Sequence, residues 1–136
     1  MPPLNRKQRL YYAAIGCGLL ALLLVARLLT PNKGGMGTHQ KLGLPPCTAI
    51  MWFGIPCPSC GMTTSWSHFT RGEFVRSWQC NAGGLCLALA SIGTGFWTIT
   101  MAIRGRYWRL ITLEASTILA IIIFAITIVD WVLRIF

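Results

Sequence analysis

Two cysteines three residues apart, Cys57 and Cys60, are the side chains of this sequence best suited to chemistry. Pro58 has no N–H and a fixed φ, which suits the first position of a helix. The pattern therefore predicts a short helix over residues 59–69, with Cys57 as its N-cap. The dipole and the free N–H groups of such a helix would lower the pKa of the capping thiol. Cys60 would follow one turn later, close enough to pair with Cys57 or to share a metal ion.

Four of the six cysteines lie in one segment, and three chemistries remain open for them. The first is a structural disulfide, such as Cys57 with Cys60 or Cys47 with Cys80, because four cysteines allow three pairings. The second is a zinc site, since Cys-Pro-x-Cys-Gly resembles one half of a zinc-ribbon ligand set. The third is thiol–disulfide exchange, with Cys57 attacking and Cys60 resolving. The candidate metal ligands are Cys57, Cys60, Cys47, Cys80 and His68.

The composition is that of an integral membrane protein. Of the 136 residues, 54% are hydrophobic and only 11% are charged, and the length fits a single domain over residues 1–136. The net charge of +9 comes from 12 Lys and Arg against three acids. Because these charges flank apolar runs instead of forming one patch, we expect contact with anionic lipid headgroups and no nucleic-acid binding.

Three apolar stretches are long enough to cross a bilayer. They cover about residues 10–29, 81–103 and 110–133, and about 20 helical residues span roughly 30 Å. We therefore predict an all-α integral membrane protein with three transmembrane helices. A loop over about residues 30–80 separates the first two spans. It would carry the Cys-Pro-Ser-Cys-Gly segment on a short interfacial or re-entrant helix.

The distribution of basic residues predicts the orientation. The N-terminal segment and the hairpin at Arg104, Arg106 and Arg109 lie on the same side of a three-span protein and are both short and basic. The positive-inside rule places them in the cytoplasm and the cysteine loop outside. In a bacterial inner membrane the loop would face the periplasm, where thiols can be oxidised.

Charged residues near the ends of the spans are expected to be structural. A carboxylate close to a membrane span is costly to bury, so Asp130 should have a cationic partner. Arg134 lies one helical turn further on, and Arg27 ends the first span at the same predicted depth. We predict an ion pair at the outer interface. The glycines and alanines of the second span predict a face that packs closely against another helix.

The segment from Gly54 to Ala102 resembles a group of small bacterial membrane proteins known as domain of unknown function 2752. The resemblance implies a Cys-Pro-x-Cys-Gly-x-Thr core, a helix, a Gly-Glu step and an Asn before the next span. Thr64 and Ala82 depart from it, because the group usually has Arg and Pro there. The positions with structural roles implied by these features are Pro58, Gly61, Thr63, Gly72, Glu73 and Asn81.

These features lead to two hypotheses of function. In the first, the protein is a non-enzymatic structural or assembly component of the membrane, its cysteine loop held by a disulfide or a metal ion. The apolar and glycine-rich faces of the spans would then bind other membrane proteins or further copies of the chain. In the alternative, the protein is a membrane thiol–disulfide oxidoreductase or a metal-handling protein that uses Cys57 and Cys60.

Overall fold

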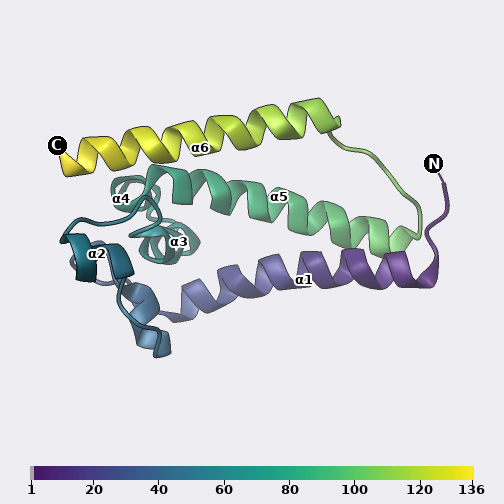
Figure 1. Cartoon of the computed structure of the whole chain (residues 1–136). Coiled ribbons are helices and arrows are strands. Elements are labelled where there is room, and N and C mark those ends of the chain that lie inside the picture. Colours follow the sequence, from purple (N-terminus) through teal and green to yellow (C-terminus); the bar gives the residue numbers. More distant parts are fainter. Residues whose placement is uncertain (1) are drawn as a thin grey trace.

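The fold is all-α, and three of its helices are long enough to cross a membrane. The computed structural model describes residues 2–136, and over that range the only β-type pairing is an isolated bridge between Pro3 and Arg106. Figure 1 shows the order and arrangement of the helices. Their bounds are α1 Arg6–Leu28, η1 (a 3-10 helix) Thr38–Leu42, α2 Thr48–Phe53, α3 Met62–Thr70, α4 Phe74–Cys80, α5 Ala82–Arg104 and α6 Leu113–Ile135.

The long helices α1, α5 and α6 confirm the three predicted spans. Each has 23 residues, which corresponds to about 35 Å at 1.5 Å per residue. Their most apolar windows have mean hydropathies of 1.8, 1.6 and 2.5. Helix α1 begins four residues before the prediction because Asn5 and Gln8 form a capping box that extends it into the polar N-terminus.

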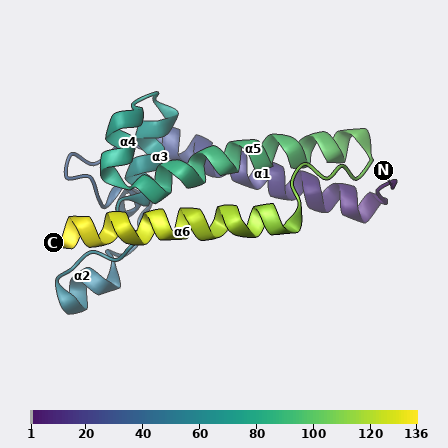
Figure 2. The ribbon, with the colours of Figure 1, turned by 90° about the horizontal axis from the view of Figure 1, so that it is seen from above.

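Helices α1 and α5 pack against each other from the basic hairpin to their middle and diverge toward the cysteine loop, where α3 lies between them (Figure 1); Figure 2 shows the same helices from above. Glycine makes this approach close. A Cβ atom on Gly16 of α1 would lie 2.8 Å from the carbonyl oxygen of Gly95 in α5. Because lipid tails are as apolar as the helices, such van der Waals contact is what holds spans together.

The small-residue face predicted for the second span is present but is divided among three neighbouring helices. Gly95 faces α1, while Gly83 faces α6, where a Cβ atom would overlap the side chain of Thr127. Gly84 faces Ser65 of α3. Gly93, which the same pattern includes, has no atom of the described residues within 4 Å of the position of a Cβ.

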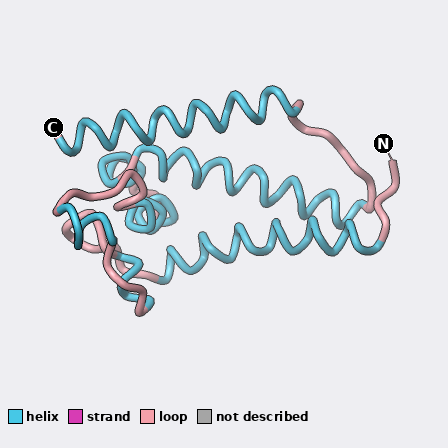
Figure 3. Tube along the Cα trace, in the orientation of Figure 1, coloured by secondary structure: helices cyan, strands magenta, loops and turns pink. Residues whose placement is uncertain are grey.

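The short helices gather at one end of the long ones (Figure 3). The C-terminal ends of α1 and α6 and the start of α5 lie at this end, with the cysteine loop (residues 30–80) between them. At the other end, the N-terminal segment pairs with the basic hairpin, since Leu4 N–H donates to the Gly105 carbonyl at 2.8 Å. The long helices therefore separate the basic hairpin from the cysteines.

Candidate metal centre

The cysteine motif forms a tight turn before α3 instead of capping a helix. The N–H of Cys60 donates to the carbonyl of Cys57 at 3.0 Å, and α3 begins only at Met62. Its N-cap is Gly61, with φ of 86°, a conformation that glycine adopts without strain. The predicted helix over residues 59–69 with Cys57 as its N-cap is therefore wrong at its start.

Close packing explains why the helix starts late. A Cβ atom on Gly61 would lie 2.7 Å from the carbonyl oxygen of Cys80 and 2.9 Å from that of Gly35. The turn is thus pressed between the end of α4 and the connector that follows α1. Only a glycine fits there, and its left-handed backbone sets the direction in which Cys57 and Cys60 project.

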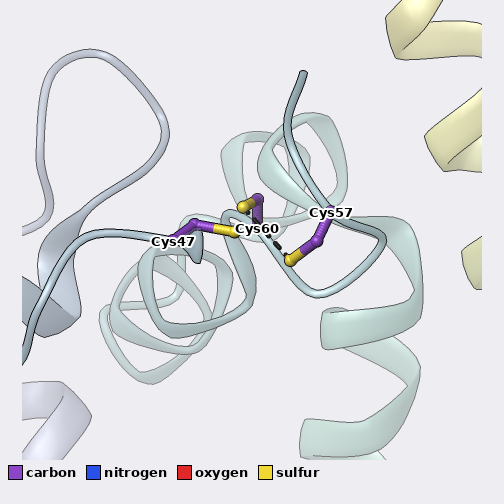
Figure 4. Close-up of side chains that lie close together, drawn as sticks. All are labelled: Cys47, Cys57 and Cys60. Atoms are coloured by element: carbon purple, nitrogen blue, oxygen red, sulfur yellow. Dashed lines mark hydrogen bonds between the residues drawn. The ribbon is translucent and has the colours of Figure 1, made fainter. Parts of the chain in front are cut away.

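Three thiols meet at this turn: Cys47, Cys57 and Cys60. Their sulfur atoms all lie within 4.8 Å of one another, and Figure 4 shows them pointing toward a common centre. The Sγ atoms of Cys57 and Cys60 are 3.3 Å apart, at hydrogen-bonding distance for thiols. Cys60 is buried, whereas the other two are partly exposed. We call these three residues the thiol cluster.

Cys47 joins the thiol cluster through a second turn. It is the N-cap of α2, and its backbone carbonyl accepts from the N–H of Met51 at 3.1 Å. Pro45 and Pro46 precede it, and the chain folds back after α2 so that Cys47 lies beside the motif. The sequence pattern could not predict this distance, because Cys57 follows Cys47 only after nine intervening residues.

The thiols differ in acidity. The N–H of Ile50 in α2 is the largest cause that lowers the pKa of Cys47 from 9.0 to about 6, and the Cys60 thiol adds to it. Burial, together with hydrogen bonds from the Cys57 and Cys47 thiols, raises the pKa of Cys60 to about 12. The lowered pKa thus belongs to Cys47, a thiol outside the Cys-Pro-x-Cys motif, at the start of α2.

Asn81 fixes the backbone of the cysteine motif through hydrogen bonds. This fully buried side chain donates to the carbonyls of Pro58 at 3.0 Å and Cys60 at 3.2 Å. Its oxygen accepts from the N–H of Gly84 at 2.8 Å, which caps α5. One asparagine thus joins the start of a span to the backbone of the turn, which gives a physical reason for an Asn at this position.

Arg134 braces the same backbone from α6. Its Nη1 donates to the carbonyls of Cys60 at 2.9 Å and Cys80 at 3.2 Å. Its Nε lies 3.0 Å from Asp130 Oδ2, an ion pair whose angle is unsuited to a hydrogen bond. The pairing of Asp130 with Arg134 is as the spacing predicts. Arg27 instead donates to the carbonyl of Thr70 at 2.6 Å and so ties α1 to α3.

Two predicted metal ligands lie outside the thiol cluster. Cys80 ends α4, and burial raises the pKa of its thiol. The His68 Nδ1–H donates to the Glu73 carboxylate at 2.6 Å, which engages that ring nitrogen and lowers the pKa of Glu73. Of the five candidate ligands, three therefore lie together: Cys47, Cys57 and Cys60.

The remaining predicted positions lie around the turn. Thr63 is partly buried in the first turn of α3, and Pro58 contributes the carbonyl that Asn81 binds. Gly72 has φ of 79° and lets the chain reverse between α3 and α4. The sequence did not reveal the buried hydroxyl pair of Ser65 and Ser77, whose oxygens are 2.8 Å apart and join α3 to α4.

A cleft of about 500 Å³ reaches the thiol cluster from outside. Its walls come from the end of α1, from η1 and from α3, and they are mostly apolar, with Leu42, Met62 and Trp66 among them. An ion could therefore enter without unfolding of the loop. Met62, whose thioether is a soft donor, also lines this cleft.

The spacing of the sulfur atoms suits a metal ion. A Zn–S bond of about 2.3 Å in a tetrahedron places sulfur atoms roughly 3.8 Å apart. The observed sulfur–sulfur separations run from 3.3 Å to at most 4.8 Å. Side-chain rotations that move each sulfur atom by less than about 1 Å would therefore bring the three atoms to the tetrahedral spacing. Thiolate donors select Zn²⁺ and Cu⁺ among common ions. The three residues therefore fit a thiophilic metal.

The helices and the site together define the class: an all-α membrane protein with three candidate spans and a thiol cluster at one end of them. Residues 47–94 match the model of the family described as "Protein of unknown function (DUF2752)", which confirms the resemblance noted in the sequence. The matched segment starts at Cys47, so it contains all three thiols of the cluster. No curated protein and no solved structure matches the chain.

Proposed function

We propose that this protein is a non-enzymatic assembly component of a bacterial inner membrane whose outer loop is held rigid by one metal ion bound to Cys47, Cys57 and Cys60. The observation that supports this proposal is the convergence of three sulfur atoms, from two separate turns, within 4.8 Å. Since ligand binding to the native fold alone stabilises that fold, the ion would couple the two turns and stiffen the loop.

A metal ion bound in this way would fix the position of α2. None of its residues is buried, and Trp52 and Phe53 are 74% and 73% exposed. Aromatic side chains are favoured where water meets lipid, which suits α2 to the outer interface. Bound metal would tie the N-terminal end of this apolar helix to the turn before α3 and so fix its position for lipid or for another membrane protein.

The orientation is part of the proposal. The basic N-terminus and hairpin lie at the end of the long helices opposite the thiol cluster (Figure 1). The positive-inside rule then places the N-terminus in the cytoplasm and the thiol cluster on the periplasmic side.

A second candidate function is thiol–disulfide exchange, which the 3.3 Å approach of Cys57 and Cys60 and the lowered pKa of Cys47 favour. The Cys47 thiolate would attack a disulfide of a partner protein, form a mixed disulfide and release one partner thiolate. A second cluster thiol would then displace the other partner cysteine. The partner would be released with two thiols, and the cluster would contain a new disulfide.

Metal content distinguishes the two candidates. The chain is purified from membranes in mild detergent, and bound Zn and Cu are measured by mass spectrometry of the elements. We expect about one ion per chain in the wild type. Each of Cys47→Ser, Cys57→Ser and Cys60→Ser should lose it, whereas Cys80→Ser, in the same loop but outside the cluster, should keep it. A metal-free wild type with a disulfide within the cluster would refute the metal proposal and favour exchange.

A further inference from the structure

A second cleft, separate from the thiol cluster, lies on another side of the cysteine loop. It has a volume of about 720 Å³ and is formed by the connector after α1, the end of α3, helix α4 and the C-terminal part of α6. None of the three cluster thiols lines it. We call it the basic cleft, because of the residues in its wall.

Four cations line the basic cleft: Lys33, Arg71, Arg76 and Arg134. Glu73 is the one carboxylate in its wall among residues 2–136. That carboxylate is already engaged, since Glu73 Oε2 lies 2.6 Å from His68 Nδ1 and 3.3 Å from Arg76 Nη1. The wall therefore carries a clear excess of positive charge.

Backbone contacts fix two of the arginines while leaving donors free. Arg71 Nη2 donates to the carbonyls of Arg27 and Leu29, at 3.1 and 3.2 Å. Arg134 Nη1 binds two carbonyls of the loop, whereas its Nη2 is buried and has no hydrogen-bond partner in the described part of the chain. A guanidinium has five N–H donors, so each side chain is held in place with capacity to bind a further acceptor.

These cations come from four separate segments of the chain, and two carboxylates partly offset their charge: Glu73 in the wall and Asp130, which pairs with Arg134. Four cations against two acids leave an excess of two positive charges. Like charges gathered in this way repel one another unless an anion lies between them. Arginine forks bind phosphate and carboxylate in two-point contacts, and a phosphate group, with three or more acceptor oxygens, can engage several cations at once. The number and spread of the cations favour phosphate.

We propose that the basic cleft binds a phosphate group, through Lys33, Arg71, Arg76 and Arg134. The volume leaves room for the group that carries the phosphate. Because the cleft lies beside the ends of α1 and α6, that phosphate is either the headgroup of an anionic phospholipid or part of a soluble phosphate ester. This site does not depend on the function proposed for the thiol cluster.

The test compares two matched variants of the full chain, each of which loses two charges. Lys33→Gln/Arg76→Gln removes two exposed cations of the cleft, neither of which holds the cysteine turn: Lys33 is exposed and the Arg76 side chain is 69% exposed. Lys7→Gln/Arg109→Gln removes the same charge at the opposite end of the long helices. Each protein is titrated in detergent with inorganic phosphate, and separately placed in nanodiscs with phosphatidylglycerol or with phosphatidylcholine alone.

Binding is read from thermal stabilisation in detergent and from retained lipid by native mass spectrometry. We expect the wild type and the Lys7/Arg109 variant to bind equally, and the Lys33/Arg76 variant to bind about tenfold more weakly. A specific response to phosphatidylglycerol alone would identify a lipid headgroup, and a response to inorganic phosphate would identify a soluble source. Equal binding by the two double variants, or no response to either probe, would overturn the proposal.

Discussion

Replacing Asn81 by alanine tests how the start of a span holds the cysteine turn. The variant loses the cap of α5, which costs about 1 kcal/mol. It also loses two hydrogen bonds to the turn, at about 1 kcal/mol each. The Cys60 carbonyl keeps Arg134 as a donor, so no further cost for an unpaired acceptor is expected at that atom. The free energy of unfolding should therefore fall by about 3 kcal/mol.

Two further variants separate the parts of this loss. Asn81→Ser keeps a side-chain oxygen for the cap but is too short to reach both carbonyls, so it should cost about 2 kcal/mol. Asn5→Ala removes a cap of the same type from α1, far from the cysteines, and should cost about 1 kcal/mol.

Unfolding is followed by far-UV circular dichroism while a denaturing detergent is titrated into mild-detergent micelles. We expect the free energy of unfolding to be lowest for Asn81→Ala, higher for Asn81→Ser and highest for Asn5→Ala. If Asn81→Ala were no more destabilising than Asn5→Ala, the hydrogen bonds to Pro58 and Cys60 would not contribute, and the bracing role would be refuted.

Two other predictions concern the thiols and the spans. In the metal-free protein, alkylation of Cys47, followed by peptide mass spectrometry, should stay rapid down to about pH 6 and fall below it, while Cys60 stays unreactive at neutral pH. The lowered pKa of Cys47 also contributes stability that is complete above pH 9 and is lost as the pH falls through about 6; equal pH profiles for the two thiols would contradict both statements. Gly83→Leu should force α5 and α6 apart at Thr127 and lower the unfolding temperature, whereas Gly93→Leu, at an open position, should change it little; equal effects of the two would exclude this contact.

Much of the scaffold could be predicted because its causes are local. Spans follow from the length and polarity of single stretches, and each predicted span overlaps a 23-residue helix. The ion pair of Asp130 with Arg134 follows from a spacing of one helical turn within one helix. The resemblance to the family indicated a structural role for Asn81 but not its hydrogen bonds to the turn.

The site was only partly predictable because its geometry depends on contacts between distant segments. Helix α3 begins after Gly61 because Gly61 packs closely against the carbonyl groups of Cys80 and Gly35. The local sequence does not encode that contact. The local signal of Pro58 pointed to a helix beginning earlier. The choice of Cys47 over Cys80 as third thiol likewise depends on how α2 folds back, which periodicity does not show.

The most direct test of the thiol cluster is X-ray absorption spectroscopy at the edge of the bound metal in the purified, membrane-extracted protein. We expect about three sulfur atoms in the first coordination shell at roughly 2.3 Å, and about two in Cys57→Ser reloaded with the metal. A shell made of oxygen and nitrogen alone, or a sulfur count that is unchanged in Cys57→Ser, would contradict a metal ion held by Cys47, Cys57 and Cys60.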